Sequence, residues 1–214
     1  IKKRLFMTAT PKFVNKIIKT KALDLDQELL SMDDTDLYGE EFYRLNFSKA
    51  IKKQLLTDYR VIISGITNEE IKEMIDKRTL VQLQDITGDA ESFANYISLI
   101  KTIRKYNLKS VITYHSSIKR AKELTNNIFK ISNIFDKDIE KKYFALHING
   151  QQSATQRKDM LDKLRFLRRG EGGIITNARC LTEGIDVPSL DGISFVDPKQ
   201  SQIDIVQAVG RAIR

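Results

Sequence analysis

Hydrophobic residues recur along the second half of the chain in two alternating patterns. Short apolar runs, rich in β-branched residues, predict buried strands over residues 111–115, 144–148, 173–176 and 192–196. Between them, apolar residues spaced three or four positions apart predict helices of about 10–15 residues. Strands that alternate with helices of this length predict an α/β fold, in which a parallel sheet carries helices on both faces.

The predicted helices have start signals and apolar stripes. Ser116 or Ser117 can cap the helix that follows residues 111–115. Ser153 and Gln156 have the spacing of a capping box for the next helix. The stripes expected to face the sheet are Phe93, Tyr96, Ile97, Ile100 and Ile103; then Ile118, Ala121, Leu124 and Ile128; then Met160, Leu161, Leu164 and Leu167.

The N-terminal part of the chain is less regular. Residues 5–7 are an apolar run that we expect to be a short buried strand, and residues 61–65 are strand-like because they are rich in β-branched side chains. A polar helix is expected around residues 69–77. We interpret residues 26–105 as a connector or insertion that precedes an α/β lobe over residues 106–214.

Composition is that of an ordinary globular protein, with 41% hydrophobic and 30% charged residues among 214. No apolar run approaches the roughly 18 residues of a membrane span, so we expect a cytoplasmic protein. Cys180 is the single cysteine and excludes an internal disulfide. With only His115 and His147 beside it, the sequence predicts no metal site.

The chain is basic, with a formal net charge of +8 and a pI near 9.4. Such a surplus favours polyanionic partners, because lysine and arginine neutralise phosphates and release counterions. Many basic proteins bind no nucleic acid, so charge alone leaves this partner open.

Polar residues follow each predicted strand. In an open parallel sheet, ligands bind beyond the carboxyl ends of the strands. The loops after residues 115, 148, 176 and 196 are rich in serine, asparagine, glutamine and aspartate, whose side chains bond phosphate or ribose. The sequence therefore predicts a ligand site at this edge of the sheet.

A last helix is predicted over residues 200–213. Gln207, Arg211 and Arg214 fall on one of its faces, and Gly210 leaves that face open to close approach. Two arginines one turn apart suit an anion with several oxygens, because guanidinium groups bind phosphate in planar forks. A solvated helix face is the alternative. The other face is apolar and carries Val206, Val209 and Ile213.

Five segments resemble, in order, the sequence motifs of superfamily-two helicases and translocases. They are Thr8-Ala-Thr10 (motif III), residues 110–117 (motif IV), His147-Ile-Asn-Gly150 with Arg157 (the short motif between IV and V), residues 173–178 with 182–188 (motif V), and Gln207 to Arg214 (motif VI). The last has the form Q-x-x-G-R-x-x-R. The resemblance covers residues 1–12 and 106–214 and implies a RecA-like sheet, the second motor lobe.

The resemblance implies a role for individual residues. Arg211 and Arg214 would be catalytic arginine fingers. The nucleotide would be contacted by Gly184, Asp186, Gln207 and Gly210. The nucleic-acid backbone would be contacted by His115, Ser116, Gly150, Thr176 and Asn177. Thr8 and Thr10 would couple the two lobes.

The phosphate-binding motifs of a first lobe are absent from this sequence. It contains neither G-x-x-x-x-G-K-[ST] nor an Asp-Glu pair at the end of an apolar strand. We expect ATP and Mg²⁺ to be bound mainly by a first lobe outside this chain, and the chain alone to be inactive. On this interpretation residues 1–25 end the first lobe, and residues 106–214 are the second lobe, truncated at its C-terminal end.

A finer resemblance concerns the stretch from Tyr38 to Val61, which is similar to the link between lobes in motors of restriction enzymes and related predicted helicases. Those motors act on duplex DNA, which is the partner implied. An RNA helicase lobe, a non-catalytic nucleic-acid-binding module and an unrelated nucleotide-binding α/β enzyme are the alternatives.

Overall fold

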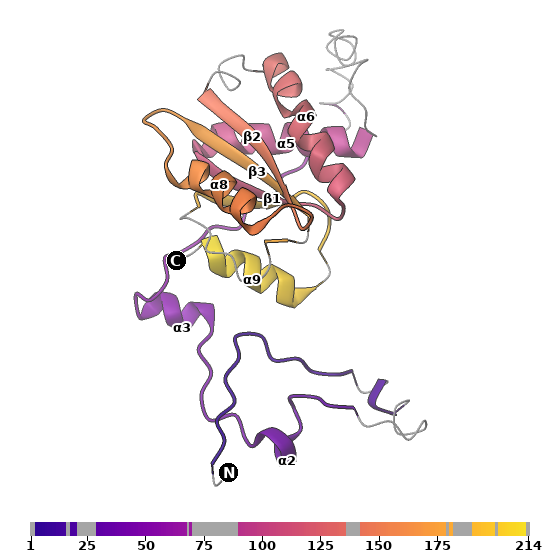
Figure 1. Ribbon diagram of the computed structural model, residues 1–214, viewed down its shortest axis with the longest axis vertical. Helices are drawn as coiled ribbons and strands as arrows, with labels where there is room; N and C mark the ends of the chain where they lie inside the picture. Colours follow the sequence, from indigo (N-terminus) through magenta and orange to yellow (C-terminus); the bar gives the residue numbers. More distant parts are fainter. Residues whose placement is uncertain are drawn as a thin grey trace. The chain divides into compact units, whose positions relative to one another are not determined.

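The computed structural model describes residues 3–15, 18–20, 29–67, 69, 90–135, 142–178, 180–181, 190–199 and 201–212. The chain divides into two compact units, Ile1–Lys53 and Gln54–Arg214. The second unit carries the sheet (Figure 1). No helix in the described ranges is both long and apolar enough to cross a membrane.

Four strands form the sheet that the described residues contain. They are β1 (Ser110–Tyr114), β2 (Tyr143–Asn149), β3 (Gly172–Ala178) and β4 (Gly192–Phe195). Their order is β2-β3-β1-β4, and every neighbouring pair is parallel. The α/β fold class is confirmed, and each of the four strands predicted from residue 111 onward lies within one or two residues of an observed one.

Helices cover both faces of this sheet (Figure 1). Val111 and Ile174 point to the face covered by α5 (Ala90–Tyr106) and α6 (Ile118–Phe135). Ile112 and Ile175, the next residue of each strand, point to the face covered by α8 (Ala154–Arg165) and α9 (Gln202–Ala212). The alternation follows from the two-residue period of a strand, and it explains why apolar residues stand at consecutive positions in these strands.

Side chains at the helix ends confirm the predicted start signals. Gln156 N donates to Ser153 Oγ at 3.2 Å, and Ser153 N donates to Gln156 Oε1 at 3.0 Å, which completes the capping box of α8. At the start of α6, Arg120 N donates to Ser117 Oγ at 3.2 Å. Of the two serines predicted as a cap, Ser117 therefore takes this role.

Helix α5 belongs to the core of the second unit. Tyr96, Ile97 and Ile100 are among the largest fully buried side chains, packed with α6 and with Val111 of β1. The expected boundary at residue 106 leaves α5 in the connector, whereas the structure places it inside the compact unit. The spacing of apolar residues 96, 97, 100 and 103 indicates that α5 packs against the lobe, because an apolar helix face needs a partner surface.

Two predicted strands do not form. Residues 5–7 make no strand, and Leu5 and Met7 are 63% and 84% exposed. Residues 61–65 make none either, and Ile63 is 97% exposed. Ser64 instead contacts α5, where Ser98 Oγ donates to Ser64 Oγ at 2.6 Å. β-Branched composition marks residues that suit a sheet, but a strand also needs a neighbour for its backbone groups. The helix expected at residues 69–77 lies outside the described residues, except for Glu69.

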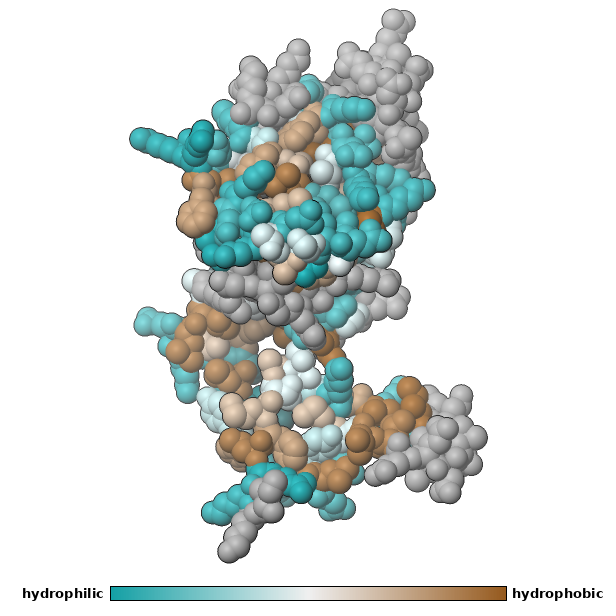
Figure 2. Space-filling view, viewed as in Figure 1, coloured by the Kyte–Doolittle hydropathy of each residue, from teal (hydrophilic) through white to brown (hydrophobic). Residues whose placement is uncertain are grey.

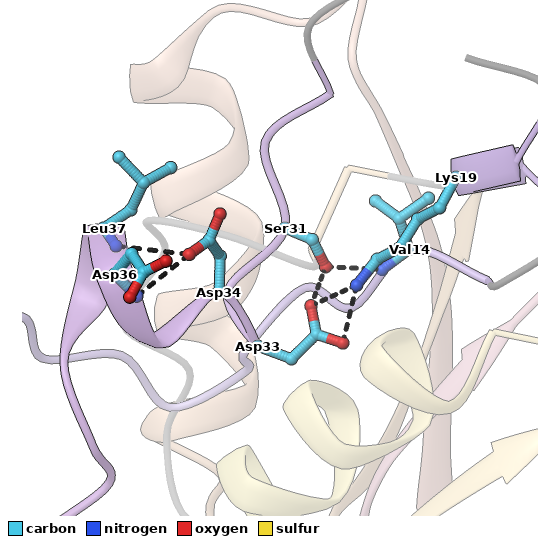
Figure 3. Close-up of polar contacts among 7 residues, drawn as sticks. All are labelled: Val14, Lys19, Ser31, Asp33, Asp34, Asp36 and Leu37. Atoms are coloured by element: carbon cyan, nitrogen blue, oxygen red, sulfur yellow. Dashed lines mark hydrogen bonds and ion pairs between the residues drawn. The ribbon is translucent and has the colours of Figure 1, made fainter. Parts of the chain in front are cut away.

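The first unit contains the short helices α2 (Thr35–Tyr38) and α3 (Phe47–Lys52) and is held by polar contacts (Figure 3). Lys19 Nζ lies 2.7 Å from Asp33 Oδ1, Ser31 Oγ donates to the same carboxylate, and Val14 N donates to Ser31 Oγ at 3.0 Å. The hydrogen bond from Lys19, followed by that from Ser31, lowers the pKa of Asp33. Asp34 caps α2 by accepting from the backbone nitrogens of residues 36 and 37.

The two units differ in surface character. Among the described residues, most exposed large hydrophobic side chains lie in the first unit, between residues 5 and 45. Five more lie between residues 55 and 63, at the start of the second unit, and Phe166 is the one from residue 90 onward. In Figure 2 the unit that carries the sheet is largely hydrophilic, and the first unit shows extended apolar areas. An apolar surface of this kind on the first unit is typical of a segment that packs against another part of a protein.

Gly173 offers a direct test of the core next to β3. A Cβ at this position would lie 2.7 Å from Leu164 Cδ1 and 2.8 Å from Phe144 Cε2. We expect Gly173→Ala to lower the free energy of unfolding by about 1–3 kcal/mol through overpacking. The matched control is Gly65→Ala, because a Cβ there meets nothing within 4 Å. Urea denaturation of both variants measures the difference, and equal stability of the two would contradict the packing described for β3.

Candidate functional site

The four strands end together at one edge of the sheet, which we call the rim. Beyond β1, His115 N donates to Asn177 O at 2.9 Å, so the pairing of β1 with β3 continues to the rim. Beyond β4, Val196 N donates to Tyr114 O at 3.1 Å. This is the edge where parallel sheets bind ligands. The predicted loops therefore start from one shared rim.

Asp197, directly after β4, organises one half of this rim. Its Oδ2 accepts from Ser116 N at 2.7 Å and from Ser116 Oγ at 2.8 Å. Its Oδ1 lies 3.0 Å from Arg120 Nη1, and Arg120 Nη2 donates to Ser92 Oγ at 3.1 Å. With only 6% of its side chain exposed, Asp197 forms a buried, charge-assisted network that fixes the loop after β1.

Sequence reasoning selected Ser116 from this network and missed Asp197 and Arg120. The signal for Asp197 was its position at the end of a predicted strand. Its partner lies 81 residues away, and no local pattern identifies that distance. Ser116 is exposed, and its hydroxyl donates to Asp197 Oδ2.

His115 is buried in the rim and is not a cation. It is 1% exposed, and its Nε2 lies 2.9 Å from Thr113 Oγ1. Burial lowers the pKa of His115 to about 4, with smaller contributions from His147 and Arg120 in the same direction, whereas Asp197 opposes the shift. A neutral, enclosed imidazole is not suited to neutralise a phosphate. Its predicted contact with nucleic acid has no exposed surface to use in this structure.

Thr176 and Asn177 at the end of β3 also point inward, and both are 0% exposed. Thr176 Oγ1 lies 2.7 Å from Thr125 Oγ1 and 3.0 Å from His147 Nδ1. Asn177 Oδ1 accepts from Cys180 N at 3.1 Å and from Cys180 Sγ at 3.0 Å. These two side chains shape the rim from within, and their expected contact with nucleic acid stays a prediction.

Cys180 is a packed thiol. Burial raises its pKa to about 11, although Arg157 acts in the opposite direction. At neutral pH the thiol is therefore protonated and unreactive.

Gly150 is exposed in the turn after β2. A Cβ built on it would meet nothing within 4 Å, so its backbone is open to close approach.

Three buried polar atoms near the rim have no hydrogen-bond partner within the part of the chain that is described: His115 Nδ1, Arg157 Nε and Asn177 Nδ2.

Helix α9 packs on the sheet through Ala208, which is fully buried with Ile112 and Leu190. The predicted contact residues, Val206 and Val209, are only partly buried. A small residue at the centre of the contact lets the helix approach the sheet closely, which explains why the larger valines lie to its sides.

Gln207 and Gly210 are also partly buried in α9, and the backbone of Arg211 lies in its last turn. The side chain of Arg211, and all of Arg214, Gly184 and Asp186, lie outside the described residues. The predicted roles of these four residues stay predictions.

Thr8 and Thr10 belong to the first unit and form a local turn. Thr10 N donates to Thr8 Oγ1 at 3.1 Å. Their expected part in coupling two lobes stays a prediction. In the described ranges no three His, Cys, Asp or Glu residues group as metal ligands.

The lowered pKa of His115 predicts that the protein becomes less stable as the pH falls below neutral. A folded pKa near 4 lies below the ordinary value of 6.5, so between these pH values the unfolded chain binds more protons than the folded chain. The free energy of unfolding should therefore fall as pH decreases through this window, by up to about 3 kcal/mol from this group. His115→Gln should reduce that slope. The chain has two histidines, so an NMR titration resolves both, and a His115 ring that titrates near 6.5 would disprove its burial.

Comparison with known proteins identifies the family. Residues 91–214 match the helicase conserved C-terminal domain. The chain is 24% identical over 211 residues to a probable helicase of African swine fever virus, a match that covers 98% of this chain and 21% of that protein. It is 22% identical over 231 residues to a putative ATP-dependent RNA helicase of Methanocaldococcus jannaschii, covering 100% of this chain and 29% of the relative.

A solved structure of a restriction enzyme is similar to this chain. It is the ATP-dependent Type ISP restriction-modification enzyme LlaBIII bound to DNA, with 32% identity and a TM-score of 0.74 over 87% of this chain and 13% of that one. The chain thus spans less than a third of the length of these proteins. Because the family match covers more than half of the chain and the parallel sheet agrees with it, this chain belongs to the helicase conserved C-terminal domain family, the second RecA-like lobe of superfamily-two helicases.

Proposed function

We propose that this chain is the second motor lobe of an ATP-dependent translocase that moves on duplex DNA. The observation that carries the proposal is the similarity to the Type ISP restriction-modification enzyme, at 32% identity over 87% of the chain. The whole protein would be a restriction-type or related DNA-processing enzyme, and its motor would hydrolyse ATP in a cleft between two lobes.

The division of work follows from the residues that each part has. ATP and Mg²⁺ would be held mainly by the first lobe, because this sequence has no phosphate-binding loop. This lobe would contribute Arg211 and Arg214, whose guanidinium groups stabilise the negative charge that develops on the transferred phosphoryl group. Gln207 and Gly210 of α9, with Gly184 and Asp186, would line the nucleotide side of the cleft.

Nucleic acid would meet the exposed parts of the rim. Gly150 and Ser116 are exposed there, whereas His115, Thr176 and Asn177 are enclosed. Contact would therefore come from loop backbone and exposed side chains, and the enclosed residues would hold the loops in shape. Contacts of this kind to the DNA backbone carry no sequence information, which suits a motor that must pass over any sequence.

The choice of substrate is testable in the intact motor that contains this chain. We expect duplex DNA to stimulate ATP hydrolysis more strongly than single-stranded RNA, with a binding constant that falls steeply as salt increases. The chain alone, assayed in parallel, should show no turnover. Stronger stimulation by RNA would instead support an RNA helicase, and binding without any turnover of the intact protein would indicate a non-catalytic module.

If Arg211 and Arg214 are arginine fingers, replacing them should lower kcat much more than ATP affinity. Arg211→Ala or Arg214→Ala in the intact motor should lower kcat by about 10³-fold or more, because an arginine finger acts mainly in the transition state. Arg211→Lys should restore little, since a point charge does not reproduce a planar fork. Arg168→Ala and Arg169→Ala are matched controls, because both side chains are exposed after α8, away from α9 in sequence. Near-normal kcat in both Arg211→Ala and Arg214→Ala would contradict their role as arginine fingers.

A further inference from the structure

A line of hydrogen bonds crosses the lobe on the face covered by α5 and α6. It runs from the turn after β2, through His147, to Thr176 of β3 and on to Thr125 of α6. His147 and Thr176 are register partners on neighbouring strands, so their side chains stand side by side. The imidazole connects an exposed turn to the interior.

The turn end of the line fixes one ring nitrogen. Gln151 N donates to Asn149 Oδ1 at 2.8 Å, so the amide oxygen of Asn149 is turned toward the turn backbone. The amide nitrogen then lies 3.1 Å from His147 Nε2. Because an amide NH₂ group only donates, Nε2 must be the unprotonated acceptor.

The helix end fixes the other nitrogen independently. Thr125 Oγ1 donates its single proton to Ala121 O at 2.9 Å. Thr176 must therefore donate to Thr125 across their 2.7 Å contact. The oxygen of Thr176 then accepts from His147 Nδ1 at 3.0 Å, so Nδ1 carries the proton. Both ends require the same neutral tautomer.

The turn is also held by hydrogen bonds of Gln152. Gln152 Nε2 donates to His147 O at 3.0 Å, and Asn149 N donates to Gln152 Oε1 at 2.9 Å. Gly150 and Gln151 are exposed, and a Cβ on Gly150 would meet open space. The shape of this exposed surface is thus set by polar contacts that converge on His147 and Asn149.

We propose that His147, held as the neutral Nδ1–H tautomer, is a positioning residue that locks the exposed turn at residues 150–152 to β3 and α6 and so sets the surface offered to the nucleic-acid backbone. The role in nucleic-acid contact rests on the proposed function, whereas the tautomer does not. If Nε2 gained a proton, Asn149 would have to turn its oxygen toward the ring and give up the bond from Gln151 N. The turn would then lose one of its anchors, the hydrogen bond from Gln151 N to Asn149.

The surroundings favour the neutral ring. Burial, followed by the charge of Lys122 on α6, lowers the pKa of His147. The other basic groups near the line are His115 at the end of β1 and Arg157 of α8, which donates to Gln152 O at 3.0 Å. Neutral solutions therefore keep the ring in the state that the line of hydrogen bonds requires.

Thr125→Val tests the line from its far end. Without the Thr125 oxygen, the Thr176 hydroxyl should turn and donate to His147 Nδ1, which moves the ring proton to Nε2 and makes Asn149 turn its oxygen toward the ring. We expect ¹⁵N NMR of the 214-residue chain to show Nδ1–H for His147 in the wild type and Nε2–H in the variant. The matched control is Thr102→Val, because Thr102 also donates to the carbonyl four residues earlier but lies on α5, outside the line. It should leave the tautomer unchanged.

The functional readout uses the same two variants in the intact motor. Thr125→Val should weaken nucleic-acid binding by about 3–10-fold, the range of one hydrogen bond, with kcat at saturating nucleic acid unchanged. Thr102→Val should match the wild type. An Nε2–H ring in the wild type, or an unchanged tautomer in Thr125→Val, overturns the inference. A tautomer change with unaltered affinity overturns the positioning role, whereas a wild-type motor that binds no nucleic acid shows that the proposed function itself has failed.

Discussion

The rest of the lobe depends on the position of β3 between β2 and β1. Its parallel register places His147 beside Thr176 and Tyr114 beside Asn177, so the last residues of the strands lie along one rim. Both faces of the sheet are covered by helices, and the strands therefore have no solvated face on which to carry polar function. Polar chemistry is confined to the rim, where the strands end and the loops begin.

At the rim, three of the five residues predicted to contact nucleic acid, His115, Thr176 and Asn177, have enclosed side chains. A buried polar group costs free energy unless it is paired, so each enclosed side chain must find partners within the protein. Asp197 pairs with Ser116 and Arg120, and Thr176 pairs with Thr125 and His147. These contacts specify where the loops stand. Removing one partner would leave the other buried without a hydrogen bond, which makes the networks sensitive to small changes.

Much of the lobe was predictable because its signals are local. Apolar β-branched runs predict buried strands, and apolar residues spaced three or four positions apart predict the buried face of a helix. The spacing of Ser153 and Gln156 alone predicts the start of a helix. The strand predicted at residues 61–65 was wrong because composition cannot show whether a neighbouring strand is present to pair with it. The exposure of His115 was not predictable either, since it depends on α6 and on residues that arrive from β3 and β4. Sequence position located the rim, but only the packed structure separates the side chains that reach its surface from those beneath it.

Helix α6 is the element that both rim networks share. Arg120 bonds to Asp197 beyond β4, and Thr125, about one and a half turns later, bonds to Thr176 at the end of β3. A shift of α6 against the sheet would therefore break an ion pair and a hydroxyl contact together, in addition to the apolar packing of Leu124 and Ile128. Such coupled losses favour movement of the sheet, α6 and the rim loops as one body. If the proposed motor function holds, a lobe of this kind would transmit a displacement of α9 to the rim without absorbing it in its own core.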